Sequence, residues 1–134
     1  MKKFIILSML ALVIGITTQA QRAIILPLAA GDTIVNTGTA SKVFQITGGY
    51  EGLVVQVNLA KISGTGAGTT GLYGSLDGVT YTQLGSNYTI TNTATQAAWF
   101  TVTAPVPVYL KVLSTGSGTE SVQQKVLYLP RRHD

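Results

Sequence analysis

Apolar and polar residues alternate with a period of two through most of the chain that follows residue 21. The clearest run lies in residues 53–60, where four aliphatic residues share one face: Leu53, Val55, Val57 and Leu59. The other face carries polar or small side chains, including Gln56 and Asn58. Successive side chains of a strand point to opposite faces, so this pattern predicts a β-strand that buries one face. We expect it to be a central strand of the core.

Similar short apolar runs recur about every ten to fifteen residues, and together with residues 53–60 they predict about eight strands. They are residues 22–28, 42–47, 72–76, 79–84, 88–91, 97–103, 108–113 and 121–129, with a short extension at 33–35. Asp77-Gly78 lies between two of these runs and is typical of a tight hairpin. No amphipathic helical pattern occurs after residue 21. The prediction is an all-β domain over residues 22–130, an antiparallel β-sandwich or jelly roll, followed by a basic tail at 131–134.

Residues 1–21 differ from the rest, and they predict an N-terminal hydrophobic helix. Lys2 and Lys3 precede an apolar run from residue 4 to residue 16, and Thr-Thr-Gln-Ala follows it. This order is typical of a secretory signal peptide cleaved after Ala20. A retained membrane anchor over residues 4–18 is the alternative, although a span usually needs about 20 apolar residues. The residues that would face lipid in such a helix are Phe4, Ile5, Leu7, Leu10, Leu12, Val13 and Ile16.

Charge is scarce and scattered, which argues against nucleic-acid binding. Charged residues make up 10% of the 134-residue chain, and its formal net charge is +4. The basic residues after the leader form no patch of the kind that phosphate binding requires. The chain has no cysteine, so disulfides and thiolate ligands are excluded. A weakly charged surface permits close contact between copies of the chain.

Groups that could carry out catalysis are few and isolated. His133 is the only histidine and lies beside the C-terminus. The acidic residues are far apart in the sequence: Asp32, Glu51, Asp77, Glu120 and Asp134. We interpret Asp32 and Asp77 as turn residues, and Glu51 and Glu120 as solvated strand ends. The sequence therefore predicts no catalytic, cofactor or metal site, and no enzyme.

Glycines 66, 68 and 71 match the G-x-G-x-x-G pattern of dinucleotide-binding loops. That pattern needs a helix immediately after it to bind the pyrophosphate, and here a predicted hairpin follows. We interpret this segment as a strand connection. Core packing is expected for Trp99 and for most tyrosines. Tyr73 and Tyr81 on the predicted hairpin are the candidates for exposure, and with Asp77 they form the possible glycan or partner contact.

Two groups of proteins resemble parts of the chain: residues 71–84 (GLYGSLDGVTYTQL), residues 109–112 (YLKV) and the turn 115–119 (TGSGT). Their order resembles small β-sandwich structural proteins of bacteriophage virions, of the head-decoration and minor capsid type. The hairpin is also similar to one in discoidin-like carbohydrate-binding modules. The first resemblance implies a non-enzymatic structural, attachment or spike-type protein of a virion, with capsid proteins, other copies of itself and a bilayer as partners. The alternative is a secreted, periplasmic or cell-surface bacterial module for carbohydrate binding or adhesion.

Overall fold

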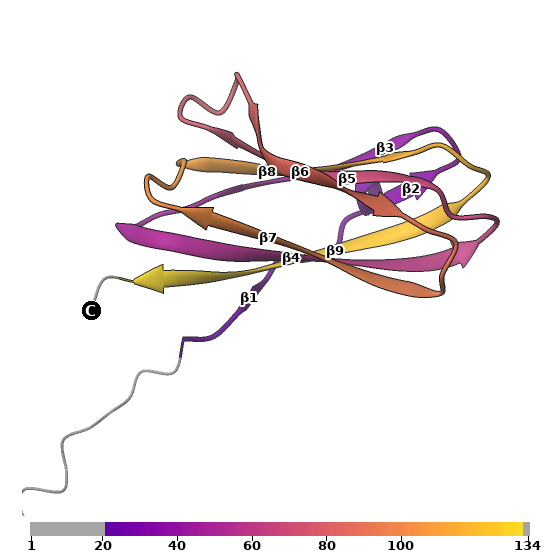
Figure 1. The fold of residues 1–134 in the computed structure, drawn as a ribbon, viewed down its shortest axis with the longest axis horizontal. Coiled ribbons are helices and arrows are strands. Elements are labelled where there is room, and N and C mark those ends of the chain that lie inside the picture. The colour runs from indigo at the N-terminus through magenta and orange to yellow at the C-terminus, as the bar shows by residue number, and fades with distance from the viewer. Residues whose placement is uncertain (1–20, 133–134) are drawn as a thin grey trace, which may run out of the picture.

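The computed structural model describes residues 21–132, which form two antiparallel sheets packed face to face (Figure 1). The strands, in chain order, are β1 (Ile24–Ile25), β2 (Thr33–Val35), β3 (Thr39–Gln45), β4 (Tyr50–Ser63), β5 (Gly68–Ser75), β6 (Thr82–Ile90), β7 (Thr95–Thr103), β8 (Tyr109–Gly116) and β9 (Ser121–Arg132). One 3₁₀ turn, η1 (Ala30–Asp32), precedes β2. The predicted all-β, two-sheet architecture is confirmed.

The first sheet, called the β4 sheet here, has the strand order β1-β9-β4-β7, and β2 also pairs with β9. The second sheet, called the β5 sheet, has the order β3-β8-β5-β6. Within the described residues, β7 and β6 therefore form one edge of the sandwich, each with a single hydrogen-bonded neighbour. The chain crosses between the sheets several times, so strands far apart in the sequence become neighbours.

The core lies between the two sheets and is made of the inward-facing residues of each strand. Leu53, Val55, Val57 and Leu59 of β4 are all between 0% and 2% exposed, which confirms the predicted core face. On the facing sheet, Leu72, Leu110 and Val112 are equally buried. Each such side chain contributes about 1.5–3 kcal/mol through removal of its surface from water. These alternating aliphatic residues are the main source of stability.

Several strand boundaries differ from the prediction. Of the expected strand 22–28, only Ile24 and Ile25 form strand β1 on β9. The Leu26 N–H still donates to the Val126 carbonyl at 3.0 Å, and Pro27, which has no N–H to donate, comes next. The expected strand 88–91 is not separate, because residues 88–90 are the last residues of β6. Residues 68–71 belong to β5, although their glycines predicted a loop. At the C-terminal end, Arg131 and Arg132 extend β9 and pair with β4, where a tail was expected.

An ion pair between Lys42 and Asp32 links the segment before β2 to strand β3. The Lys42 ammonium on β3 lies 2.8 Å from a carboxylate oxygen of Asp32 and donates to the Pro27 carbonyl at 2.6 Å. The same Asp32 oxygen accepts the Ala29 N–H. Asp32 does lie in a turn, as predicted, but it is also buried, with 3% of its surface exposed.

The predicted leader helix, Phe4 to Ile16, lies outside the described residues. Within residues 21–132, no helix is long and apolar enough to cross a membrane.

Candidate functional site

Two tyrosines and one lysine come together on the outer face of the β5 sheet. Leu72 of β5 and both Leu110 and Val112 of β8 are buried, so their neighbours Tyr73 and Lys111 point outward. Tyr73 and Lys111 are also directly opposite each other in the strand pairing. The pair is therefore built by the register of two strands that are well separated in the sequence.

Tyr81 completes this group from the connection that leads into β6. The Lys111 ammonium lies 4.2 Å from the centroid of the Tyr81 ring and 5.6 Å from that of Tyr73. Both distances are within the range of cation–π attraction. Among the described residues, no acidic side chain forms a salt bridge with Lys111. All three side chains are half-buried, so part of each ring remains accessible to a partner.

Two amide side chains of β6 lie beside Tyr73. Gln83 is opposite Tyr73 in the β5–β6 pairing, and its amide nitrogen donates to the Asn87 side-chain oxygen at 3.0 Å. Gly71 makes room here, because a Cβ at that position would collide with the Asn87 amide and approach the Tyr73 ring at 3.3 Å. We call these five residues the tyrosine–lysine surface: Tyr73, Tyr81, Gln83, Asn87 and Lys111.

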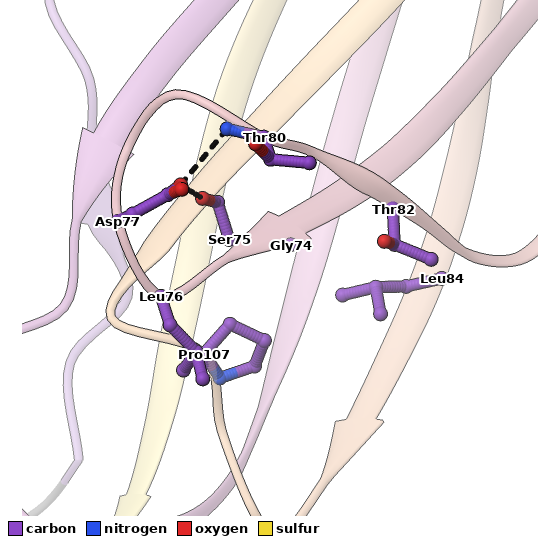
Figure 2. Close-up of a pocket in the computed structure, with 8 residues that line it drawn as sticks. All are labelled: Gly74, Ser75, Leu76, Asp77, Thr80, Thr82, Leu84 and Pro107. Atoms are coloured by element: carbon purple, nitrogen blue, oxygen red, sulfur yellow. Dashed lines mark hydrogen bonds between the residues drawn. The ribbon is translucent and has the colours of Figure 1, made fainter.

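Asp77 organises the turn of the hairpin (Figure 2). Its Oδ1 accepts the Ser75 hydroxyl at 2.7 Å and the N–H groups of Val79 and Thr80, each at 2.8 Å. These hydrogen bonds, led by that from Ser75, hold the pKa of the Asp77 carboxyl well below its usual range. The prediction of Asp77 as a turn residue is confirmed. Its predicted role in glycan or partner contact is not tested, and one of its oxygens is already occupied by the turn.

An open hollow of about 380 Å³ lies beside this turn. Its lining consists of Gly74, Ser75, Leu76, Asp77, Thr80, Thr82, Leu84 and Pro107 (Figure 2). Gly74 and Leu84 are the strand neighbours of Tyr73 and Gln83, so they lie on the opposite face of the hairpin. The hollow and the tyrosine–lysine surface therefore use different sides of the same hairpin.

Trp99 occupies the outer face of the β4 sheet, where its side chain is 65% exposed. Its neighbours Ala98 and Phe100 face the core, at 0% and 7% exposed. The expectation that Trp99 packs in the core is therefore wrong. The alternation of residues 97–103 contained the signal, because it places Ala98, Phe100 and Val102 on one face and Trp99 on the other.

The acidic residues do not assemble into a catalytic or metal-binding cluster within residues 21–132, where no group of three or more His, Asp or Glu side chains could hold a metal ion. His133 and Asp134 lie outside the described residues. Glu120 is not a solvated strand end, as had been expected, but is 1% exposed. Its burial comes from the glycine-rich turn before it, which places its carboxylate inside the end of the sandwich.

Comparison with known proteins gives a slight structural likeness only. No protein-family profile matches the chain, and no curated protein sequence matches it. Among solved structures, a non-crystalline cellulose-specific carbohydrate-binding module, CBM28, superimposes with a TM-score of 0.48. The two chains are 8% identical, and the match covers 85% of this chain and 74% of the module. This likeness transfers neither residues nor a ligand to the present chain.

Proposed function

We propose that this chain is a non-enzymatic recognition module that binds glycans on the tyrosine–lysine surface. The observation that carries the proposal is the outward cluster of two half-buried tyrosine rings around a lysine that has no acidic partner in the described part of the chain. Aromatic rings present an apolar face together with a polar edge, which suits the C–H face and the hydroxyls of a sugar ring. The Gln83–Asn87 amides beside Tyr73 add hydrogen-bond donors and acceptors.

Lys111 indicates which glycans to test first. Its ammonium lies over the Tyr81 ring, so a neutral sugar that stacks on this ring must displace it. A uronic acid can instead pair its carboxylate with the ammonium while the sugar ring contacts Tyr73. Charge-assisted hydrogen bonds of this kind are stronger than neutral ones. We therefore expect tighter binding of polyuronates than of neutral glucans.

The test is calorimetric titration of the purified chain with oligogalacturonate, oligomannuronate and a neutral cello-oligosaccharide. Replacement of Tyr73 or Tyr81 by alanine should weaken binding about tenfold, which corresponds to about 1.4 kcal/mol. Tyr88→Ala is the matched control, because Tyr88 lies on the same β6 strand and is 36% exposed outside the surface. The proposal is refuted if binding survives both tyrosine replacements. It is also refuted if none of the three oligosaccharides binds to the wild-type chain.

A second candidate is a structural role, as a virion or cell-surface subunit that contacts copies of itself. It is favoured by β7, an edge strand whose residues 95–103 (TQAAWFTVT) contain neither charge nor proline. Unprotected edge strands are templates for pairing with another chain. Trp99 adds a large exposed ring beside this edge.

Mass measurement of the native protein separates the two candidates. If copies pair through β7, Trp99→Lys should convert oligomers to monomers and leave glycan binding unchanged. A wild-type chain that stays monomeric at high concentration would exclude this mode of assembly. Intact mass of the protein from its source also shows whether residues 1–20 are retained, as an anchored virion protein requires, or removed, as a secreted module requires.

A further inference from the structure

Glu120 is a buried carboxylate in the turn between β8 and β9, and one of its oxygens has no hydrogen-bond partner among residues 21–132. Its Oε1 accepts the Ser117 N–H at 3.2 Å, whereas Oε2 accepts no hydrogen bond from the described residues. The side chain is 1% exposed and forms no salt bridge within residues 21–132. A buried carboxylate without a compensating group is costly, so a cation beside it would be stabilising.

The space around this carboxylate is lined with other oxygen atoms. A Cβ at Gly118 would lie 2.5 Å from both Glu120 Oε2 and the Thr65 carbonyl oxygen. Both oxygens therefore lie against Gly118, and they are separated by at most twice that distance. At Gly116, a Cβ would collide with the other carboxylate oxygen and with the Asn36 carbonyl oxygen. Both glycines leave the carboxylate and the carbonyls in direct proximity.

Three connections meet at this end of the sandwich: the β2–β3 turn with Asn36, the β4–β5 connection with Thr65, and the β8–β9 turn. Backbone hydrogen bonds already join them, from Asn36 N–H to the Glu120 carbonyl at 2.7 Å and from Ser117 N–H to the Ala67 carbonyl at 3.0 Å. These hydrogen bonds bring the three connections together around the carboxylate. Thr65, Ser117 and Thr119 are exposed, so water can reach the turn.

We propose that Glu120 and the carbonyl oxygen of Thr65 bind a calcium ion that links these connections. Ca²⁺ takes 6–8 oxygen ligands at about 2.3–2.6 Å, from carboxylates, backbone carbonyls and water, in flexible geometry. One cation can therefore bridge the Glu120 and Thr65 oxygens. Mg²⁺ demands a smaller octahedral site and keeps its water, so it should bind more weakly. The site was not expected from the sequence, in which Glu120 is an isolated acid, and it is independent of the tyrosine–lysine surface.

The test uses the full chain after treatment with a chelator, titrated with CaCl₂ or MgCl₂ in a calorimeter and followed by thermal unfolding. We expect calcium at about 100 times its Kd to raise Tm by roughly 5–15 °C, and magnesium at the same concentration to raise it less. Glu120→Gln should lose the calcium-dependent rise. Glu51→Gln, the same chemical change at the far end of β4, should keep it.

Gly118→Ala is a second variant that places a methyl group between the two oxygens and should reduce the calcium-dependent rise without removing any charge. The proposal is overturned if calcium neither binds to the wild-type chain nor changes its Tm. It is equally overturned if Glu120→Gln shows the wild-type increment. Should Glu120→Gln fail to fold, the wild-type titration and Gly118→Ala still decide the question.

Discussion

A buried hydrogen-bond network in the core, which includes one bond between the two sheets, offers a quantitative test of how polar groups are accommodated there. The Ser114 hydroxyl on β8 lies 2.7 Å from the Thr70 hydroxyl on β5 and 2.8 Å from the Gln124 side-chain oxygen on β9. All three residues are 0–1% exposed. A hydroxyl has one proton and an amide oxygen can only accept, so Ser114 donates to Gln124 and Thr70 donates to Ser114. The bond from Ser114 to Gln124 joins the β5 sheet to the β4 sheet.

Ser114→Ala removes both hydrogen bonds and adds no clash. The Thr70 hydroxyl and the Gln124 oxygen are then left buried without partners. Each such unsatisfied group lowers stability by about 1–3 kcal/mol. We expect the free energy of unfolding to fall by about 2–6 kcal/mol. The Gln124 side-chain nitrogen is already without a partner in the described part of the chain, so it adds nothing to this change.

The triple variant Thr70→Val, Ser114→Ala and Gln124→Met should behave differently. It replaces every polar group of the network with an apolar group of similar shape, and it also removes the unpartnered Gln124 nitrogen. Complete apolar replacement of buried partners can be nearly neutral or stabilising. We expect the triple variant to lie within about 1 kcal/mol of the wild type, and therefore to be more stable than Ser114→Ala alone.

Urea unfolding of the full chain, followed by far-ultraviolet circular dichroism, measures these differences. Ser41→Ala on the exposed face of β3 is the matched control and should change stability by less than about 0.5 kcal/mol. A triple variant that is no more stable than Ser114→Ala would refute the reasoning. That result would show that the cost comes from lost packing or from net hydrogen-bond strength, and not from unsatisfied polar atoms.

Three further predictions concern other parts of the molecule. Leu59→Ala should lower the free energy of unfolding by about 2–5 kcal/mol in the same urea assay, because Leu59 is 1% exposed. Lys42→Met leaves Asp32 buried and unpaired, so the free energy of unfolding should fall by about 3 kcal/mol. Proteolysis of the segment before β2 should also become faster, which mass spectrometry of limited digests would show. The lowered pKa of Asp77 means that its turn contributes full stability above the unfolded pKa of about 4, and loses it as the pH falls through the lower folded pKa. After correction for the intrinsic exchange rate at each pH, protection of the Val79 amide should therefore fall progressively below about pH 4, and it should show no such acid dependence in Asp77→Asn.

Alternation of apolar residues predicts the fold of this chain well because burial in a sandwich acts on every second residue. The face of β4 that begins at Leu53 could be identified directly from this pattern. The same rule places Trp99 outside, and it was overlooked because large aromatic rings are more often buried than exposed. In this strand the alternation of apolar and polar positions predicts the exposure of Trp99 better than its residue type does.

Strand ends were harder to predict than strand faces, because pairing partners come from distant parts of the chain. Residues 68–71 are rich in glycine and threonine and have little intrinsic preference for a strand. All four nevertheless pair with β8 on one side, and residues 68–70 also pair with β6 on the other. Gly68, at φ 139°, shows why glycine is used here, since a Cβ at this position would collide with the Thr115 carbonyl oxygen. A local pattern contains no information about such a close approach.

The two candidate sites illustrate different limits of sequence reasoning. The hairpin pattern could select Tyr73 and Tyr81 as surface residues, although both are half-buried, but it could not select Lys111, because only the β5–β8 register places it beside them. The interpretation of the site depends on that lysine, since two tyrosines alone favour neutral sugars and an ammonium beside them favours acidic ones. Glu120 was assigned to solvent because isolated acids usually are exposed. Its burial instead requires glycine at both Gly116 and Gly118, so the glycines that suggested a flexible turn are the residues that allow a carboxylate to be held inside it.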